Sequence, residues 1–319
     1  MAAPIPIRAW HWAGFILFIL VSVWLDLGLF HRSARPVSTR QALLRSGVWL
    51  LLALLFAGLL AQWRSREDSL QFLAGYMVEY SLSLDNVLAM AVIFASLGVA
   101  AEHQRRVLCL GIAGAVLMRG LMIGAGAALL QRFHWLLYLM GLFLVVTGLR
   151  WGFSRPAAAR PQDNPAIRLA RKLFPVSAGF DGGRFVTMAG GRRAFTALAV
   201  AVVAVDTADL VFAVDSIPAV FAVTQNAFIV FTSNMFAILG LRSLYFVLAG
   251  AMGAFRHLRA GLACVLVVVG LKMLAAPWLK VATSLLLGAV LVIVAAAMAY
   301  SILAARREKG RADKPCSPP

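Results

Sequence analysis

Charged residues are scarce in this sequence of 319 residues, because only 13% are Asp, Glu, Lys or Arg while 62% are hydrophobic. A soluble domain carries about twice that share of charge. The apolar residues gather in long blocks that match the roughly twenty residues a helix needs to cross a hydrocarbon core. The composition therefore excludes an ordinary soluble domain and predicts an integral membrane protein.

Alternation of apolar and polar residues with period two is also missing, which argues against an outer-membrane β-barrel. Lipid offers the backbone no hydrogen-bond partners, so helices remain as the spanning structure. The three cysteines, Cys109, Cys264 and Cys316, have neither paired spacing nor a CxxC motif, and we expect no disulfide. The predicted fold class is all-α, a polytopic membrane helix bundle.

Acidic residues are outnumbered by basic ones, 13 against 30, which gives a net charge of +17. In a soluble protein that excess would suggest nucleic acid. Here 22 of the 30 Lys and Arg residues lie on one side of the membrane and 5 on the other if the N-terminus is outside. This asymmetry predicts a multi-pass protein with its C-terminus in the cytoplasm, and its expected partner is the lipid bilayer rather than nucleic acid.

Nine apolar blocks, separated by polar breaks, predict nine transmembrane helices. The first block has no small-residue cleavage site after it, so we interpret it as an uncleaved span. The blocks lie at 12–30, 44–62, 71–97, 107–130, 135–152, 197–222, 226–249, 258–276 and 279–303.

The predicted organisation has six parts. A proline-containing, arginine-rich loop separates two groups of three helices, and we expect it to be an ordered or semi-ordered connection. The parts are an N-terminal two-helix segment (1–70), a first three-helix repeat (71–152), a basic cytoplasmic loop (153–196), a second three-helix repeat (197–276), a last transmembrane helix (277–303) and a basic cytoplasmic tail (304–319).

Two segments, EYSLSLDNVLAMAVIF at 79–94 and DLVFAVDSIPAVFAVT at 209–224, resemble each other. Both begin with an acid and continue, after five residues, with Asp and a small amide or hydroxyl residue. An intramembrane arginine follows one span later. Three spans separate the two units, so they run in opposite directions, as in many secondary transporters. The matched pairs are Glu79 with Asp209, Asp85 with Asp215, Asn86 with Ser216, and Arg119 with Arg242.

Five carboxylates fall inside the third and sixth predicted spans, those of Glu79, Asp85, Asp206, Asp209 and Asp215. Each costs about 2.5–3.5 kcal/mol at a helix centre when it is unpaired, or about 15 kcal/mol together. The two intramembrane arginines can balance two of them at most. The remaining negative charge predicts a cation site, although acids and arginines that simply lock helices together are the alternative.

Carboxylate, amide, hydroxyl and carbonyl oxygens are hard ligands that suit Mg²⁺, Ca²⁺ or Mn²⁺. We predict that Asp85 and Asp215 are paired ligands. Pro218 removes the hydrogen bond to the Val214 carbonyl and predicts a broken helix beside Asp215. The supporting ligands are predicted to be Glu79, Asp209, Asp206, Asn86 and Ser216, with Asn234 either reaching the site or bonding between helices, and Arg119 and Arg242 balancing charge.

At these residues the chain resembles the TerC family of membrane proteins over roughly residues 20–300, most specifically in AVDSIPA and in the FTSN, ILGLR and LYF segments. The resemblance implies a plasma (inner) membrane protein of a family named for tellurium resistance, with members that export Mn²⁺. It also implies inverted three-helix repeats. Asp206 stands where the family leads us to expect Glu, so the reach of that ligand is shorter by one methylene.

The predicted function is therefore export of a divalent metal ion, most of all Mn²⁺, without a prosthetic group. The alternatives are export of another divalent cation such as Ca²⁺, and a non-transporting membrane scaffold for tellurite or metal stress that recruits membrane-protein partners. No activated serine, HExxH or GxGD motif is present, and we expect no enzymatic activity.

Overall fold

The computed structural model describes residues 7–28, 39–153, 184–189, 192–248, 258–279 and 281–312. Most of the predicted cytoplasmic loop and the end of the tail lie outside these residues. The described chain forms nine α-helices and one two-stranded sheet. The helices are α1 (Ala9–Gly28), α2 (Thr39–Trp63), α3 (Arg66–Leu97), α4 (Ala101–Arg132), α5 (Leu136–Phe153), α7 (Ala197–Phe221), α8 (Ala227–Leu248), α9 (Leu258–Ala275) and α10 (Thr283–Ala312).

Each of the nine predicted spans coincides with one of these helices. Six of them, α2, α3, α4, α5, α7 and α10, are long and apolar enough to cross a membrane, while the apolar stretches of α1, α8 and α9 are shorter. The helical membrane class is therefore confirmed, and the count of nine crossings stays a prediction.

Local sequence explains where α3 begins and ends. Ser65 precedes the helix in an extended conformation, and its hydroxyl accepts a hydrogen bond from the Asp68 amide at 3.0 Å. Glu67 and Asp68 place negative charge in the first turn, where the helix dipole favours it. Gly98 closes the helix in the left-handed conformation, with φ of 65°, which glycine adopts without a steric penalty.

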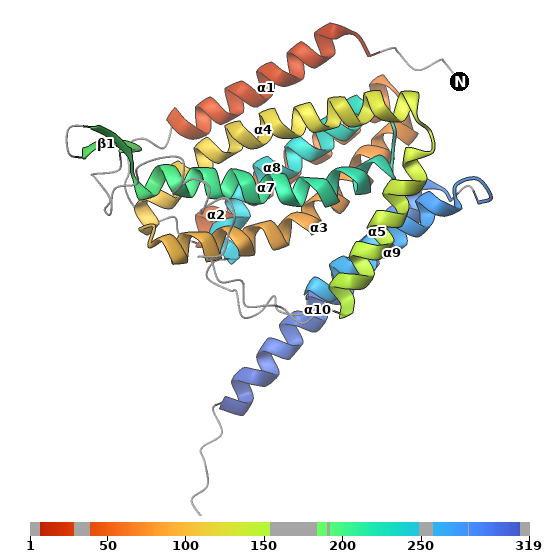
Figure 1. Ribbon diagram of the computed structural model, residues 1–319. Helices are drawn as coiled ribbons and strands as arrows, with labels where there is room; N and C mark the ends of the chain where they lie inside the picture. Colours follow the sequence, from red (N-terminus) through yellow and green to blue (C-terminus); the bar gives the residue numbers. More distant parts are fainter. Residues whose placement is uncertain are drawn as a thin grey trace, which may run out of the picture.

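The core of the bundle is formed by α3, α4, α7 and α8. α3 packs on both α7 and α8, α4 packs on the same two helices, and α2 covers α3 and α8. Figure 1 shows α5 and α9 side by side, inclined to these helices, with α10 extending past them. The large side chains that remain exposed on α1, α2, α5 and α10 are mostly apolar, which fits a surface that faces lipid.

Glycines bring the backbones of α5 and α9 into direct contact. A Cβ atom at Gly270 would lie 2.7 Å from the carbonyl oxygen of Gly141, and one at Gly148 would lie 2.8 Å from that of Ala263. Close backbone approach at small residues is a main source of helix association in lipid. These two helices therefore form the most closely packed helix pair in the described chain.

The predicted break beside Asp215 is wrong, because α7 runs without interruption from Ala197 to Phe221. Pro218 lies in the last turn of α7, and only three helical residues follow it. The missing N–H therefore deprives only the Val214 carbonyl of its intrahelical partner. One missing hydrogen bond in the last turn does not interrupt the helix.

A short antiparallel hairpin, β1 (Val186–Ala189) and β2 (Arg192–Phe195), precedes α7. Val186 pairs with Phe195 and Met188 pairs with Arg193. The prediction of an entirely α-helical chain missed it. The sequence between the strands, Gly190–Gly191, is a dipeptide typical of two-residue hairpin connections, so the signal was present.

Candidate functional site

A buried arginine lies where the four core helices meet. Arg119 of α4 has no exposed surface, and its guanidinium grips Asp209 of α7 with two parallel hydrogen bonds, Nε to Oδ2 at 3.1 Å and Nη2 to Oδ1 at 2.8 Å. Nη1 donates to Glu79 Oε1 of α3 and, at 2.9 Å, to Asn234 Oδ1 of α8. This planar fork suits carboxylates, and it ties both matched acids of the two predicted repeats to one cation.

The Glu79 carboxylate is fully buried and has partners on both oxygens. Asn234 Nδ2 donates to Oε2 at 2.9 Å, and Ser83 Oγ donates to Oε1 at 3.1 Å. Ser216 Oγ lies 3.4 Å from Arg119 Nη1 at the edge of the same network. A buried ion pair persists only when such hydrogen bonds offset the cost of removing its charges from water.

Asp206 lies one turn before Asp209 on α7, against two glycines of α4. A Cβ atom at Gly114 would approach the Asp206 Oδ2 atom to 2.6 Å, and one at Gly111 would approach Oδ1 to 3.2 Å. The absence of side chains at these glycines thus makes room for the carboxylate. Asp206 Oδ1 is buried and has no hydrogen-bond partner among the described residues.

The charge of this region does not balance within the described side chains. Glu79 and Asp209 share Arg119, which leaves one negative charge in the cluster. Asp206 and the half-buried Asp215 add two more, and neither forms an ion pair with a described residue. A buried carboxylate without a cation is costly, so the region can accept a positive charge.

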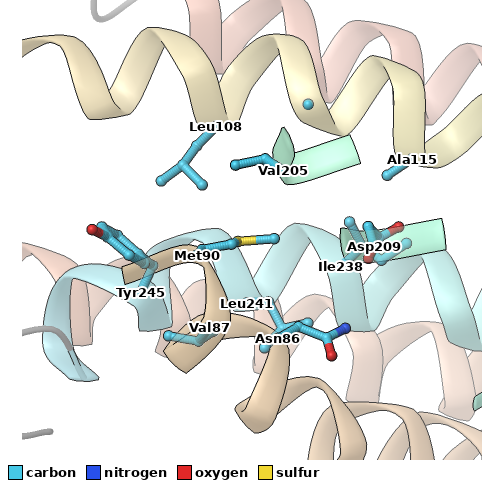
Figure 2. Close-up of a pocket in the computed structure, with 11 residues that line it drawn as sticks. Asn86, Val87, Met90, Leu108, Ala115, Val205, Asp209, Ile238, Leu241 and Tyr245 are labelled. Atoms are coloured by element: carbon cyan, nitrogen blue, oxygen red, sulfur yellow. The ribbon is translucent and has the colours of Figure 1, made fainter. Parts of the chain in front are cut away.

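A small cavity of about 40 Å³ lies beside the cluster, between α3, α4, α7 and α8. In Figure 2, Asp209 and Tyr245 are toward opposite ends of this cavity, with Asn86 between them. Asn86 Oδ1 is buried and lacks a described partner. The apolar lining residues are Val87, Met90, Leu108, Gly111, Ala115, Val205, Ile238 and Leu241.

The predicted site residues fall into three groups. The structure joins Glu79, Asp209, Ser216, Asn234 and Arg119 in one network. It places Asn86 in the wall of the cavity and Asp206 against Gly111 and Gly114. Asp215 lies further along α7. The side chains of Asp85 and Arg242 lie outside the described residues, so the pairing of Asp85 with Asp215 stays a prediction.

Among the described residues, no three His, Cys, Asp or Glu side chains lie close enough together to hold a metal ion. The ligand set remains a prediction there too. Sequence reasoning missed Gly111 and Tyr245, which line the cavity, and Gly114, which makes room for the Asp206 carboxylate. Small residues in a predicted span let helices approach closely, and on that ground Gly111 and Gly114 could have been identified.

Residues 64–310 match the integral membrane protein TerC family. A Myxococcus xanthus protein named "Uncharacterized membrane protein STKORF319" is 45% identical over 92% of this chain and 92% of its own length. The "Putative membrane-bound redox modulator Alx" of Photorhabdus laumondii is 39% identical over 91% of this chain and 94% of its own. The Escherichia coli K12 protein of that name is 38% identical over 88% and 90%. No solved structure matches the chain.

Proposed function

The chain belongs to the integral membrane protein TerC family, and from this premise we propose that it exports a divalent metal ion, Mn²⁺ in the first place, from the cytoplasm. The observation that carries the proposal is the surplus of carboxylates over cations deep in the bundle. Among the described side chains of α3, α4 and α7 around the cluster, the carboxylates of Glu79, Asp206, Asp209 and Asp215 outnumber the one cation, Arg119, which pairs with Glu79 and Asp209. Another described cation, Lys272 of α9, binds the Ala222 carbonyl at the end of α7. A transported cation would supply the charge that is lacking.

Two orphan acceptors support a cation site beside the cavity. Asn86 Oδ1 and Asp206 Oδ1 are buried without donors among the described residues, although buried polar atoms are nearly always paired. Both are hard oxygen ligands of the kind that Mn²⁺, Mg²⁺ and Ca²⁺ accept. We assign Asp85 and Asp215 as the paired ligands, with the other acids, Asn86 and Ser216 in support.

Arg119 has a different role in this proposal. It holds Glu79 and Asp209 in a fixed arrangement and leaves Asp206 and Asp215 to meet the ion. Arg242 of α8 would be its counterpart in the second repeat. The protein would need no prosthetic group and would perform no enzymatic reaction.

The packing of the helices supports two inverted repeats, α3–α5 and α7–α9. In such a pair of repeats α3 corresponds to α7, α4 to α8, and α5 to α9. The contact of α3 with α8 then has a symmetric counterpart in the contact of α7 with α4, and both contacts are extensive. The contacts of α3 with α7 and of α5 with α9 each join two corresponding helices, as expected across a symmetry axis. Such symmetry would place the substrate near the midplane of the inner membrane, with the N-terminus outside and the C-terminus in the cytoplasm.

The test is Mn²⁺ movement in vesicles that contain the purified full-length protein and a Mn²⁺-quenched fluorophore. Asp85→Asn and Asp215→Asn should abolish transport at normal protein abundance, because hard cations depend on carboxylate charge. Asp68→Asn is the matched control, since it removes a carboxylate from α3 outside the cluster and should preserve transport.

Competition with Ca²⁺ and Mg²⁺ in the same assay measures selectivity. Preferred transport of Ca²⁺ would replace the manganese assignment. Vesicles with correctly folded protein that move no divalent ion would refute transport and favour the membrane scaffold.

A further inference from the structure

The hairpin of β1 and β2 directly precedes a helix that can cross the membrane. Only Thr196 separates β2 from α7, which is long and apolar enough to cross the bilayer. Figure 1 shows the hairpin projecting from the end of the bundle at which α7 begins. Its position along the membrane normal is therefore fixed by the point at which α7 enters the lipid.

Two hydrogen bonds hold the base of the hairpin to Thr196, the residue that directly precedes α7. Thr196 is buried, its hydroxyl donates to the Arg184 carbonyl at 2.7 Å, and its amide donates to the Phe185 carbonyl at 3.1 Å. Phe185 also packs against the apolar cluster that contains Leu198 of α7. These contacts fix the hairpin relative to the membrane-crossing helix.

One face of β1 presents apolar side chains away from the protein. Met188 is 70% exposed and Val186 is 45% exposed, while Thr187 between them is half-buried. This alternation is what a strand gives when one face packs and the other does not, because successive side chains point to opposite faces. The outward face is the one with the two apolar residues, the reverse of the usual pattern for a surface hairpin in water.

The charged residues of the hairpin itself are all arginines, and Asp181 precedes it in the chain. Residues 182–205 contain Arg184, Arg192 and Arg193 and no acid, and Arg184 is exposed. Apolar side chains accompanied by basic residues are typical of segments that lie in the interface of a membrane with anionic lipids. Both the charge and the continuity with α7 favour the bilayer as the partner of this face.

We propose that the hairpin docks on the anionic headgroup layer of its own membrane and inserts Val186 and Met188 between the lipids. The arginines contact phospholipid phosphates, and each changes the ratio of docked to undocked hairpin by about fivefold. This site is separate from the charged cluster and does not depend on transport activity.

Spin-label accessibility at Met188→Cys tests the proposal in full-length protein whose native cysteines are alanine. The label is exposed to oxygen, which concentrates in lipid, and to a nickel chelate, which stays in water. In vesicles with anionic phosphatidylglycerol the oxygen-to-nickel ratio at 188 should exceed severalfold that of the matched control Thr187→Cys. The ratio should fall in pure phosphatidylcholine and on adding Arg184→Gln.

Two results would overturn the proposal. A label at 188 that collides mainly with the nickel chelate in anionic vesicles lies in water, and one that neither reagent reaches is covered by protein. The unmutated protein gives a second measurement, because peroxide converts accessible methionine to its sulfoxide. Oxidation of Met188 should be slower in anionic than in zwitterionic vesicles, and equal rates would contradict docking.

Discussion

Replacing Arg119 with glutamine removes the guanidinium on which the Glu79 and Asp209 carboxylates converge. Glutamine cannot supply the positive charge or the paired hydrogen bonds to Asp209. Removing one partner of a buried ion pair costs about 3–5 kcal/mol, because the other charge stays buried without compensation. Arg119 has two acidic partners on different helices, so we expect a loss near the upper value, about 5 kcal/mol.

A loss of this size should lower Tm by on the order of 10 °C in a chain of this length. The assay is the fraction of monodisperse protein that remains after heating in detergent, measured for variants purified from equal membrane amounts. Arg119→Lys is the informative control. It keeps the charge but not the fork, and it should melt between wild type and Arg119→Gln.

A double mutant isolates the electrostatic cause. Adding Asp209→Asn to Arg119→Gln removes a carboxylate that the single variant leaves uncompensated. The double variant should therefore be more stable, by about 0.5–3 kcal/mol, than the sum of the stability losses of the two single variants implies. Additive losses, or an Arg119→Gln variant that melts within about 2 °C of wild type, would refute the argument that this arginine stabilises the bundle through the two acids.

Three further predictions concern packing, a half-buried lysine and topology. Gly270→Ala should cost about 1–3 kcal/mol by forcing α5 and α9 apart, whereas Gly288→Ala, where an added Cβ meets nothing within 4 Å, should leave the melting curve unchanged. Lys272 donates at 2.7 Å to the carbonyl of the residue that caps α7, and Lys272→Met should cost about 1–3 kcal/mol in the same melting assay. Reporters fused after Pro319 and inserted near Asp163 should both report the cytoplasm, and a periplasmic signal from either would reverse the assigned orientation.

The positions of the helices could be predicted because lipid imposes one simple requirement on each of them. A span must be apolar and about twenty residues long, and both properties are visible along a single sequence. The polar breaks at Ser65 and Gly98 accordingly bound α3 within a few residues of the prediction. Which helices pack together depends on shape, which no single span contains.

The members of the charged network could also be predicted, since an ionisable residue inside a span is too costly to be incidental. Their pairing could not. A helical wheel places Glu79 and Asn86 on one face of α3 but gives no rotation of α3 relative to α4. The grip of Arg119 on Asp209, 90 residues away in sequence, follows only from the assembled bundle.

Two errors came from local rules applied without their context. Proline predicted a helix break beside Asp215, but the rule is weak in the last turn of a helix, where few bonds remain to be lost. The hairpin was missed because its strands have only four residues each. A strand of four residues is far shorter than an apolar block of membrane length, so the pattern that predicts the spans does not predict the hairpin.

The glycine contact between α5 and α9 can form only some time after α5 has been synthesised, because α9 comes much later in the chain. α5 ends at Phe153 and α9 begins at Leu258, about a hundred residues later. At about 5–20 residues per second, a ribosome needs roughly 5–20 s to make the intervening chain. For that time the glycine face of α5, which includes Gly141 and Gly148, has been inserted without the surface it was shaped to meet. A chaperone or lipid that shields this face during synthesis would act on α5 before its contact with α9 can form.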